Sequence, residues 1–272
     1  INLSDMDFEF SSNVQDYKNK INIDEKLKKI KLINNKLNIS DNLILPKDFT
    51  FELNSDSEII LEGSANLIIE SDIFYSKNDS LEENVKHTIK FISKGDNCIL
   101  FKNNSISVIN LSFEGFSACK VGGFYLTSGV NFYKSNIGAK NLIAMNNKSG
   151  DDLINIVKSQ FEISKIYLEN SLYDGLDIDY SEGIASKISC FNCGKKEGGD
   201  GIDLSHSKIF IEELNIENSF DKGLSIGENT NLNIKNLNVA NAKVCLANKD
   251  GSHSIISSVK ISNCKIGIAA FT

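Results

Sequence analysis

Acidic residues recur at a fixed spacing in the second half of the chain. The tetrapeptide Asp174-Gly-Leu-Asp177 returns as Asp200-Gly-Ile-Asp203, with both acids displaced by the same interval. Carboxyl groups that come close together can share a proton and work as general acid and base, or bind a divalent cation. Which chemistry is open to them depends on the elements that position them.

The tetrapeptides belong to a longer repeat with a period of about 22 residues. Its unit starts at six positions, and only the interval from the second to the third is longer, by four: Asp152, Asp174, Asp200, Lys222, Val244 and Ile266. A second series keeps nearly the same intervals: Asn147, Asn170, Asn192, Asn218, Asn241 and Asn263. Such a period is typical of a repeat protein in which each unit buries its apolar face only against its neighbours.

Apolar residues alternate within each unit, as in Leu176/Ile178 and Ile202/Leu204. This period of two indicates short strands with one buried face. We therefore predict an all-β protein, a right-handed single-stranded parallel β-helix with about 22 residues per coil, over residues 42–272. The asparagines should form an internal hydrogen-bonded ladder at a tight turn.

Residues 1–41 are more charged and have a mixed period, so we predict an N-terminal cap or linker there, which could be an amphipathic helix over the first coil. The chain starts with Ile1 and its last segment stops within a repeat, which suggests a fragment of a longer protein.

Stacked coils turn distant residues into neighbours. If Leu176 and Ile178 point inward, Asp177 and Asp179 point outward, and Asp203 lies one coil above Asp177. Two carboxylates about 5 Å apart repel by about 3 kcal/mol at an effective dielectric near 20. Solvent, a bound cation or a shared proton would relieve this repulsion. Alternatively, Asp174 and Asp200 are structural, accepting backbone N–H bonds at corners with Lys222 as counter-ion.

The segments "GLDID", "GIDLS" and "GLSIG", with the asparagine series, resemble the right-handed parallel β-helix of the pectate-lyase-like superfamily. More narrowly, they are similar to bacterial β-helix domains of surface or polysaccharide-related proteins. The resemblance runs from Leu43 to the end and implies the fold, which hosts lyases, hydrolases, epimerases and adhesins. Pectate lyases of the superfamily commonly use an arginine as base, and this chain has no arginine.

Two functions remain open. In one, the chain processes or binds a bacterial-surface or environmental polysaccharide through the acidic patch, as a lyase, glycoside hydrolase or uronate epimerase. In the other, it is a non-catalytic structural or adhesive module of a larger envelope protein. The predicted catalytic residues are Asp177, Asp203, Tyr180, His206 and Lys222. The predicted substrate-binding residues are Asp179, Glu228 and Lys158, and calcium would be held by Asp177, Asp203 and Asp179.

Composition narrows the partners and the compartment. A net charge of -7 and a pI near 5.1 argue against nucleic acid. No apolar run has the length of a membrane span, and no signal peptide is visible. We expect an extracellular, cell-surface or periplasmic protein, with other domains of the same polypeptide as further partners. The six cysteines show no disulfide framework, and Cys190-x-x-Cys193 lacks a second pair for zinc, so we expect small apolar fillers.

Overall fold

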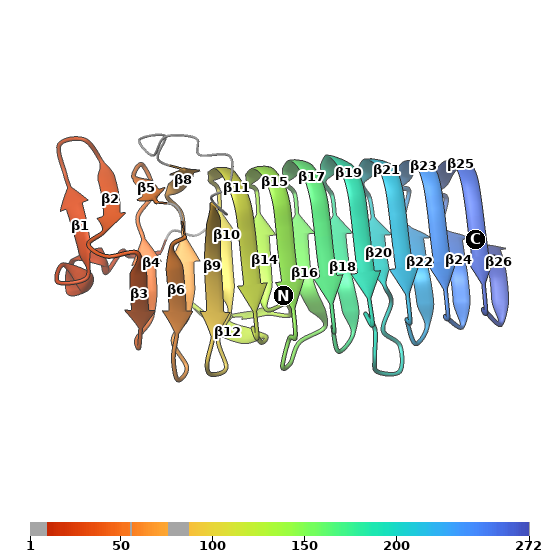
Figure 1. Ribbon diagram of the computed structural model, residues 1–272, viewed down its shortest axis with the longest axis horizontal. Helices are drawn as coiled ribbons and strands as arrows, with labels where there is room; N and C mark the ends of the chain where they lie inside the picture. The colour runs from red at the N-terminus through yellow and green to blue at the C-terminus, as the bar shows by residue number, and fades with distance from the viewer. Residues whose placement is uncertain (1–9, 55, 76–86, 272) are drawn as a thin grey trace.

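The computed structural model describes residues 10–54, 56–75 and 87–271. Short strands follow one another around a rod, and successive turns stack along its long axis (Figure 1). Nearly all pairing is parallel, in two large sheets. No helix among these residues has the length and apolarity needed to cross a membrane.

Sheet B has ten strands. In spatial order they are β4 (Leu43–Leu45), β7 (Leu67–Ile69), β10 (Ile99–Lys102), β14 (Val130–Tyr133), β16 (Asp152–Val157), β18 (Asp174–Asp179), β20 (Ile202–Ser205), β22 (Lys222–Gly227), β24 (Val244–Lys249) and β26 (Ile266–Phe271).

Sheet A has fourteen strands. Its main path is β1 (Ile21–Asp24), β2 (Lys29–Leu32), β5 (Thr50–Leu53), β8 (Asp72–Tyr75), β11 (Ser105–Glu114), β15 (Asn136–Met145), β17 (Gln160–Glu169), β19 (Glu182–Phe191), β21 (Lys208–Glu217), β23 (Asn231–Ala240) and β25 (His253–Ser262). A side branch, β3 (Lys36–Ile39), β6 (Glu58–Leu61) and β9 (Thr88–Ser93), joins it at the long strand β11.

The strand register confirms the parallel β-helix. Successive partners in sheet B are Asn131, Asn155, Asp177, Asp203, Ser225, Ala247 and Ala269.

The length of a turn follows from pairs that are bonded across adjacent turns. Asn155 and Asp177 are 22 residues apart, as predicted for a coil, whereas Asp174 and Asp200 are 26 residues apart. The first turns have the same length, since Lys36 pairs with Glu58 and Thr50 with Asp72. The turns around β10 are longer, and the paired side chains of Glu70 and Lys102, on adjacent turns, are 32 residues apart. The predicted coil length therefore holds for most of the stack and not for the turns around β10.

The core fills the inside of the rod with one apolar side chain above another. Ile154, Leu176, Ile202 and Leu224 are consecutive register partners, and none of them has solvent-exposed surface. Because each turn buries its apolar face only against the turns beside it, the repeat has no stable unit smaller than a stack.

The N-terminal end is closed by strands, where the sequence suggested an amphipathic helix. Within residues 10–41 the only helix is one turn of 3-10 helix, η2 (Val14–Tyr17). Strands β1 and β2 form an antiparallel hairpin that pairs with β5. Strand β3 already pairs in parallel with β6, so residues before 42 contribute to the stack. Residues 1–9 of the predicted cap lie outside the described part.

The asparagine ladder exists, but it differs from the prediction in two respects. Its first member is Asn146, whose Oδ1 accepts a hydrogen bond from Asn170 Nδ2 at 3.0 Å. Asn147 instead points inward and accepts the backbone N–H of Leu172. Asn218 bridges Asn192 and Asn241, at 2.9 Å each, on the exposed outer side of the turn. The ladder is therefore external, and positive φ angles select asparagine there.

A buried hydroxyl ladder lies at the other turn, where the chain passes from sheet B to sheet A. The backbone N–H of Ser135 donates to Ser159 Oγ, that of Ser159 to Ser181 Oγ, and that of Ser181 to Ser207 Oγ, each at 3.0 Å. Thr230 and Ser252 continue the series. The sequence carries the signal as a serine or threonine one or two residues after each of these turn residues: Lys134, Lys158, Tyr180, His206, Glu228 and Asp250.

All six cysteines form disulfides, which corrects the expectation of apolar fillers. The pairs are Cys98–Cys119, Cys190–Cys193 and Cys245–Cys264. Cys245 and Cys264 are 19 residues apart, nearly one turn of the solenoid, whereas Cys98 and Cys119 are 21 residues apart within one longer turn. The pairing was missed because it depends on the turn geometry rather than on cysteine spacing.

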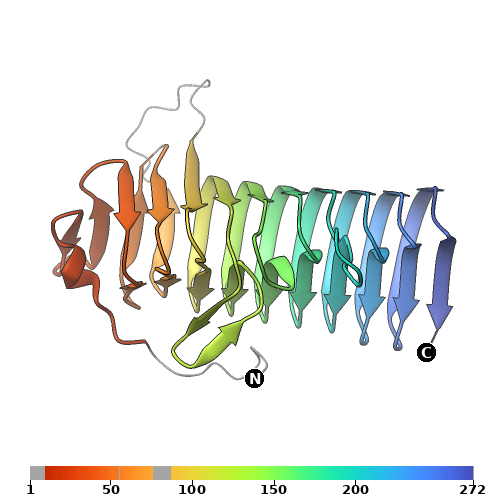
Figure 2. The same cartoon turned by 90° about the horizontal axis from the view of Figure 1, so that it is seen from below.

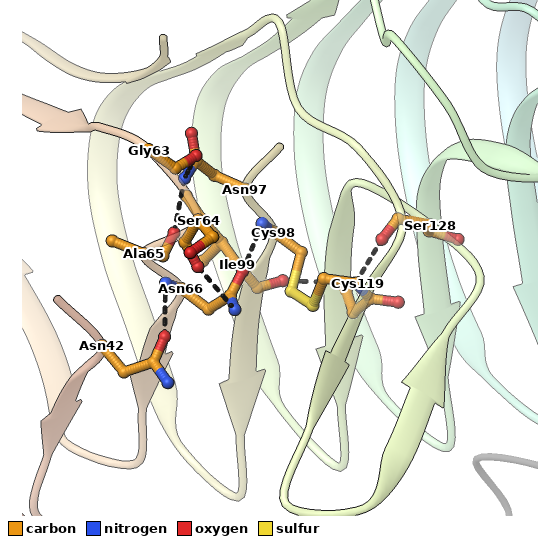
Figure 3. The surroundings of a disulfide bond; sticks show 11 residues. Asn42, Gly63, Ser64, Ala65, Asn66, Asn97, Cys98, Ile99, Cys119 and Ser128 are labelled. Carbon is orange, nitrogen blue, oxygen red and sulfur yellow. Dashed lines mark hydrogen bonds between the residues drawn. A yellow bond between two sulfur atoms is a disulfide. The ribbon is translucent and has the colours of Figure 1, made fainter. Parts of the chain in front are cut away.

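One hairpin lies outside the rod, against the outer face of sheet B. It consists of β12 (Cys119–Val121) and β13 (Phe124–Leu126) and stands out below the stack in Figure 2. Leu126 packs with outward-facing Leu100, Tyr133 and Val157 in a second apolar cluster. The Cys98–Cys119 disulfide ties the hairpin to the start of β10 (Figure 3). The hairpin thus covers sheet B as far as β16.

Candidate functional site

The predicted columns of side chains are present beside this hairpin. Asn155, Asp177, Asp203 and Ser225 are register partners on four successive strands of sheet B, and we call them the central column. Val157, Asp179, Ser205 and Gly227 are stacked in the same way. The corner column, at the strand starts, consists of Asp152, Asp174, Asp200 and Lys222.

The acids point away from the apolar core, yet they are not freely solvated. Asp152 and Asp200 are each only 3% exposed, and Asp177, Asp179 and Asp203 are half-buried. Asp152 Oδ2 accepts a hydrogen bond from Ser128, in the segment that follows the hairpin. Stacked neighbours and this segment therefore cover carboxyl groups that were expected on an open surface.

Backbone groups hold the corner column in place. Asp174 Oδ1 accepts the N–H of Asp200 at 2.7 Å, and Asp200 Oδ1 accepts the N–H of Lys222 at 2.9 Å. The Lys222 ammonium lies 2.9 and 3.1 Å from the two oxygens of Asp200 and 2.9 Å from Asp221. The structure therefore contains the contacts expected if Asp174 and Asp200 are structural residues and Lys222 is their counter-ion.

Burial and mutual repulsion raise the pKa of these carboxyl groups. Burial, followed by the charges of Asp200 and Asp152, raises the pKa of Asp174 to about 8. Burial and Asp151 raise the pKa of Asp152 to about 7. Burial and the neighbouring aspartates raise the pKa of Asp177 well above its ordinary value. Protonated and ionised carboxyl groups thus coexist here near neutral pH.

The pKa values are lower toward the ends of the cluster. Burial, with Asp203 and Glu228, raises the pKa of Asp179 to about 6, while His206 acts in the opposite direction. Burial also raises the pKa of Asp200 to about 6, against the lowering effect of Lys222. Burial lowers the pKa of Lys222, but its bonds to Asp221 and Asp200 outweigh this and leave the pKa above the ordinary lysine value.

Three carboxylates are arranged so that they could hold a cation. One oxygen each of Asp174, Asp200 and Asp203 lies within 4.8 Å of the other two. Of the predicted calcium ligands Asp177, Asp179 and Asp203, only the last belongs to this group, so that ligand set stays a prediction. Asp203 Oδ1 is buried without a hydrogen-bond partner among the described residues, as are Asn155 Oδ1 and Ser225 Oγ in the same central column.

The turn that follows sheet B carries the remaining predicted residues. Lys158, Tyr180, His206 and Glu228 stack there with φ angles of 49°, 49°, 49° and 56°. The rings of Tyr180 and His206 are parallel, with centroids 4.4 Å apart, and His206 Nδ1 lies 3.2 Å from Glu228. The structure thus places these four side chains in one row alongside Asp179.

Asp152 and Asn155 were not among the predicted site residues, although both contact the site. Asn155 Nδ2 lies 3.5 Å from Asp152 Oδ2 and 3.4 Å from Asp177 Oδ2. The repeat register alone would have identified them, because each is one unit before a predicted acid.

A groove of about 840 Å³ lies elsewhere, on the outer face of sheet A. Its lining includes Glu162, Glu182, Ile184, Lys208 and Phe210. None of the predicted site residues lines it, and the carboxyl groups with raised pKa values all lie on sheet B or its corner. We therefore place the candidate chemistry on sheet B.

Comparisons with known proteins give the following result. No protein-family model and no curated protein matches the chain. Among solved structures, it is similar to a point mutant of the periplasmic alginate epimerase AlgG, at 9% identity and a TM-score of 0.37 over 95% of this chain and 83% of the other. A second mutant and the unmutated AlgG match at 10% and 9% identity, covering 94% and 95% of this chain and 82% and 83% of theirs, with TM-scores of 0.30 and 0.27. At this level the likeness says nothing about activity, and the fold assignment rests on the strand register.

Proposed function

We propose that this protein processes a polysaccharide on the outer face of sheet B, with the central and corner columns and Asp179 as its active surface. The observation that carries the proposal is the group of stacked carboxyl groups whose burial brings several pKa values to between about 6 and about 8. A general acid and a general base can then both be populated at the same pH. Carboxyl groups with a purely structural role would not need both the protonated and the ionised form.

Glycoside hydrolysis is the reaction that this arrangement supports best. It requires one protonated and one ionised carboxyl group on either side of the glycosidic bond. Asp177 and Asp203, on adjacent strands, are proposed as this pair. A strand spacing of about 4.8 Å is close to the carboxyl separation of about 5 Å that accompanies retention of configuration. Tyr180, His206, Asp179, Glu228 and Lys158 would border the sugar.

The charge of the surface favours a neutral glycan. Aspartates outnumber the single lysine of the two columns, and that lysine is already bonded to Asp200 and Asp221. A uronate carboxylate would therefore be repelled unless a cation intervened. The raised pKa of Lys222 keeps it protonated, which counts against the catalytic role predicted for it, if that role is to accept a proton, and favours a counter-ion role.

The Asp174–Asp200–Asp203 oxygens favour a second candidate, a calcium-dependent uronate lyase or epimerase. Calcium would neutralise the uronate carboxylate, and Tyr180 or His206 would exchange the C5 proton.

Both candidates fit an extracellular, cell-surface or periplasmic location, because disulfides persist in oxidising compartments. Other domains of the same polypeptide remain proposed partners.

The decisive experiment compares the wild type with Asp177→Asn and Asp203→Asn on neutral and uronate polysaccharides, with calcium or a chelator. We expect new reducing ends from a neutral glycan, and their loss in both variants with little change in melting temperature. Glu162→Gln, on sheet A, is the matched control and should stay active. Unsaturated or epimerised product that needs calcium would select the second candidate. Glycan binding without any product would select the structural or adhesive module instead.

A further inference from the structure

We infer that the hairpin β12–β13 closes one end of the active surface on sheet B, so that a polysaccharide is shortened from one chain end and not cut in the middle. The inference rests on the proposed function and describes how the substrate lies on that same site. In its reaction, one water adds across the glycosidic bond next to the chain end, and that bond breaks to release one short product.

The hairpin covers the part of sheet B that precedes the acids. Its apolar side chains pack in one cluster with outward-facing residues of three successive strands: Leu100 of β10, Tyr133 of β14 and Val157 of β16. Every residue of these three strands is buried. A glycan on the outer face therefore has no accessible side chain to contact on them.

The cover ends directly before the proposed catalytic pair. Asn155 on β16 is only 4% exposed, whereas its register partner Asp177 on β18 is half-buried. In the neighbouring column, the buried Val157 is likewise followed by the half-buried Asp179. Because strands are spaced by about 4.8 Å, only about one sugar unit fits between the covered strand and a bond flanked by Asp177 and Asp203.

The hairpin is fixed at both of its ends. The Cys98–Cys119 disulfide ties its first strand to the start of β10 (Figure 3). Beyond its second strand, Ser128 donates a hydrogen bond to Asp152 at the start of β16. These two attachments make the hairpin a fixed end wall of the active surface.

The opposite side of the active surface has no such wall. Beyond Asp203, the central column continues with the small residues Ser225, Ala247 and Ala269. All strands within residues 152–271 belong to the two large sheets, so none of them crosses the outer face as the hairpin does (Figure 2). The long part of a bound chain therefore extends toward β26.

The first test follows viscosity and reducing ends together while the wild type acts on xylan, glucomannan, galactan and dextran. We expect products of about one or two sugar units, with a viscosity that falls slowly as reducing ends appear. A rapid fall in viscosity with fragments of intermediate size would overturn the inference and leave the proposed function standing. If no product forms from these or from uronate polysaccharides, the proposed function fails, and the inference fails with it.

The second test obstructs the open side with Ala269→Trp. Ala269 lies three strand spacings from Asp203, about 14 Å, so a trisaccharide bound at the acids does not reach it. We expect KM for the polysaccharide to rise by about tenfold, with trisaccharide hydrolysis unchanged. Ala240→Trp, on sheet A, is the matched control and should change neither. An unchanged KM in Ala269→Trp would mean that the chain does not extend toward β26.

The third test lowers the wall. Replacing residues 120–125 by Gly-Gly shortens the hairpin and keeps Cys119 and Leu126. We expect viscosity to fall faster for each reducing end formed, because the chain can then continue across β16. A folded shortened variant with the product sizes of the wild type would overturn the role of the hairpin. If this variant does not fold, the first two tests decide.

Discussion

At the scale of single residues, burial decides what the aspartates of sheet B can do. Asp177 and Asp203 point outward, as alternation requires, but stacking leaves little water around them. Repulsion between neighbours is then relieved by holding protons rather than by solvent screening. The acidic repeat is therefore a group of coupled carboxyl groups, not a row of independent surface charges.

This coupling predicts how stability depends on pH. The raised pKa values mean that the folded protein holds protons which the unfolded chain releases above about pH 4. The free energy of unfolding should therefore fall as the pH rises from about 4 to about 8. We expect a melting temperature at pH 8 that is lower than at pH 5 by about 5 °C or more.

Asp174→Asn provides the control for this pH dependence. It keeps an oxygen for the Asp200 N–H but cannot ionise, so its melting temperature should fall less between pH 5 and pH 8. A wild-type protein that becomes more stable over this range would show that the carboxyl groups are ionised at little cost.

A second prediction concerns the external ladder at Asn218, where φ is 64°. Asn218→Ala should destabilise the protein by about 1–2 kcal/mol, because alanine tolerates this backbone poorly and makes neither ladder bond. Asn218→Gly removes the ladder bonds but tolerates the backbone, so it should cost less. Urea denaturation of both variants measures the difference. Equal losses would assign the cost to the hydrogen bonds alone.

At the scale of elements, the sharp turn from sheet B to sheet A depends on the buried hydroxyl ladder. Ser181 Oγ accepts the N–H of Ser159 and lies 2.8 Å from the carbonyl oxygen of Asp179. It therefore pairs backbone groups that water does not reach, at the point where the acidic strand ends. The ladder therefore fixes the point where strand β18 ends at Asp179 and the turn with Tyr180 begins.

Ser181→Ala should cost about 1–3 kcal/mol, since it leaves the buried Ser159 N–H without a partner. Ser181→Thr should be nearly neutral, because Thr230 fills the same position two turns later. The free energy of unfolding in urea checks both values. An alanine variant as stable as the threonine variant would mean that the ladder contributes nothing.

At the scale of the whole molecule, function and stability both follow from stacking. Each turn is held by the turns on either side, so a change of loop length is tolerated wherever the strands keep their register. The turn between Asn192 and Asp200 is the natural place to test this, because its exposed loop is longer than those of its neighbours.

Deletion of residues 195–198 should leave the β-helix intact and shorten this turn from 26 residues to the 22 residues of the next one. We expect an unchanged circular dichroism spectrum and a melting temperature within about 5 °C of the wild type. An equally long deletion inside β19 is the control and should unfold the protein, since it breaks the register. If the loop deletion unfolds the protein as the strand deletion does, the claim that a turn tolerates a change of loop length is wrong.

The sequence alone was enough for the parallel β-helix, for the stacking of Asp177 on Asp203 and for the row from Lys158 to Glu228. A repeat of nearly constant length specifies which residues share a column, because each turn rises by one strand spacing. It did not specify what covers a column. The burial of Asp152 and the hairpin over sheet B depend on segments outside the repeat, and the three disulfides depend on which cysteines the turns bring together, so only the tertiary structure showed them.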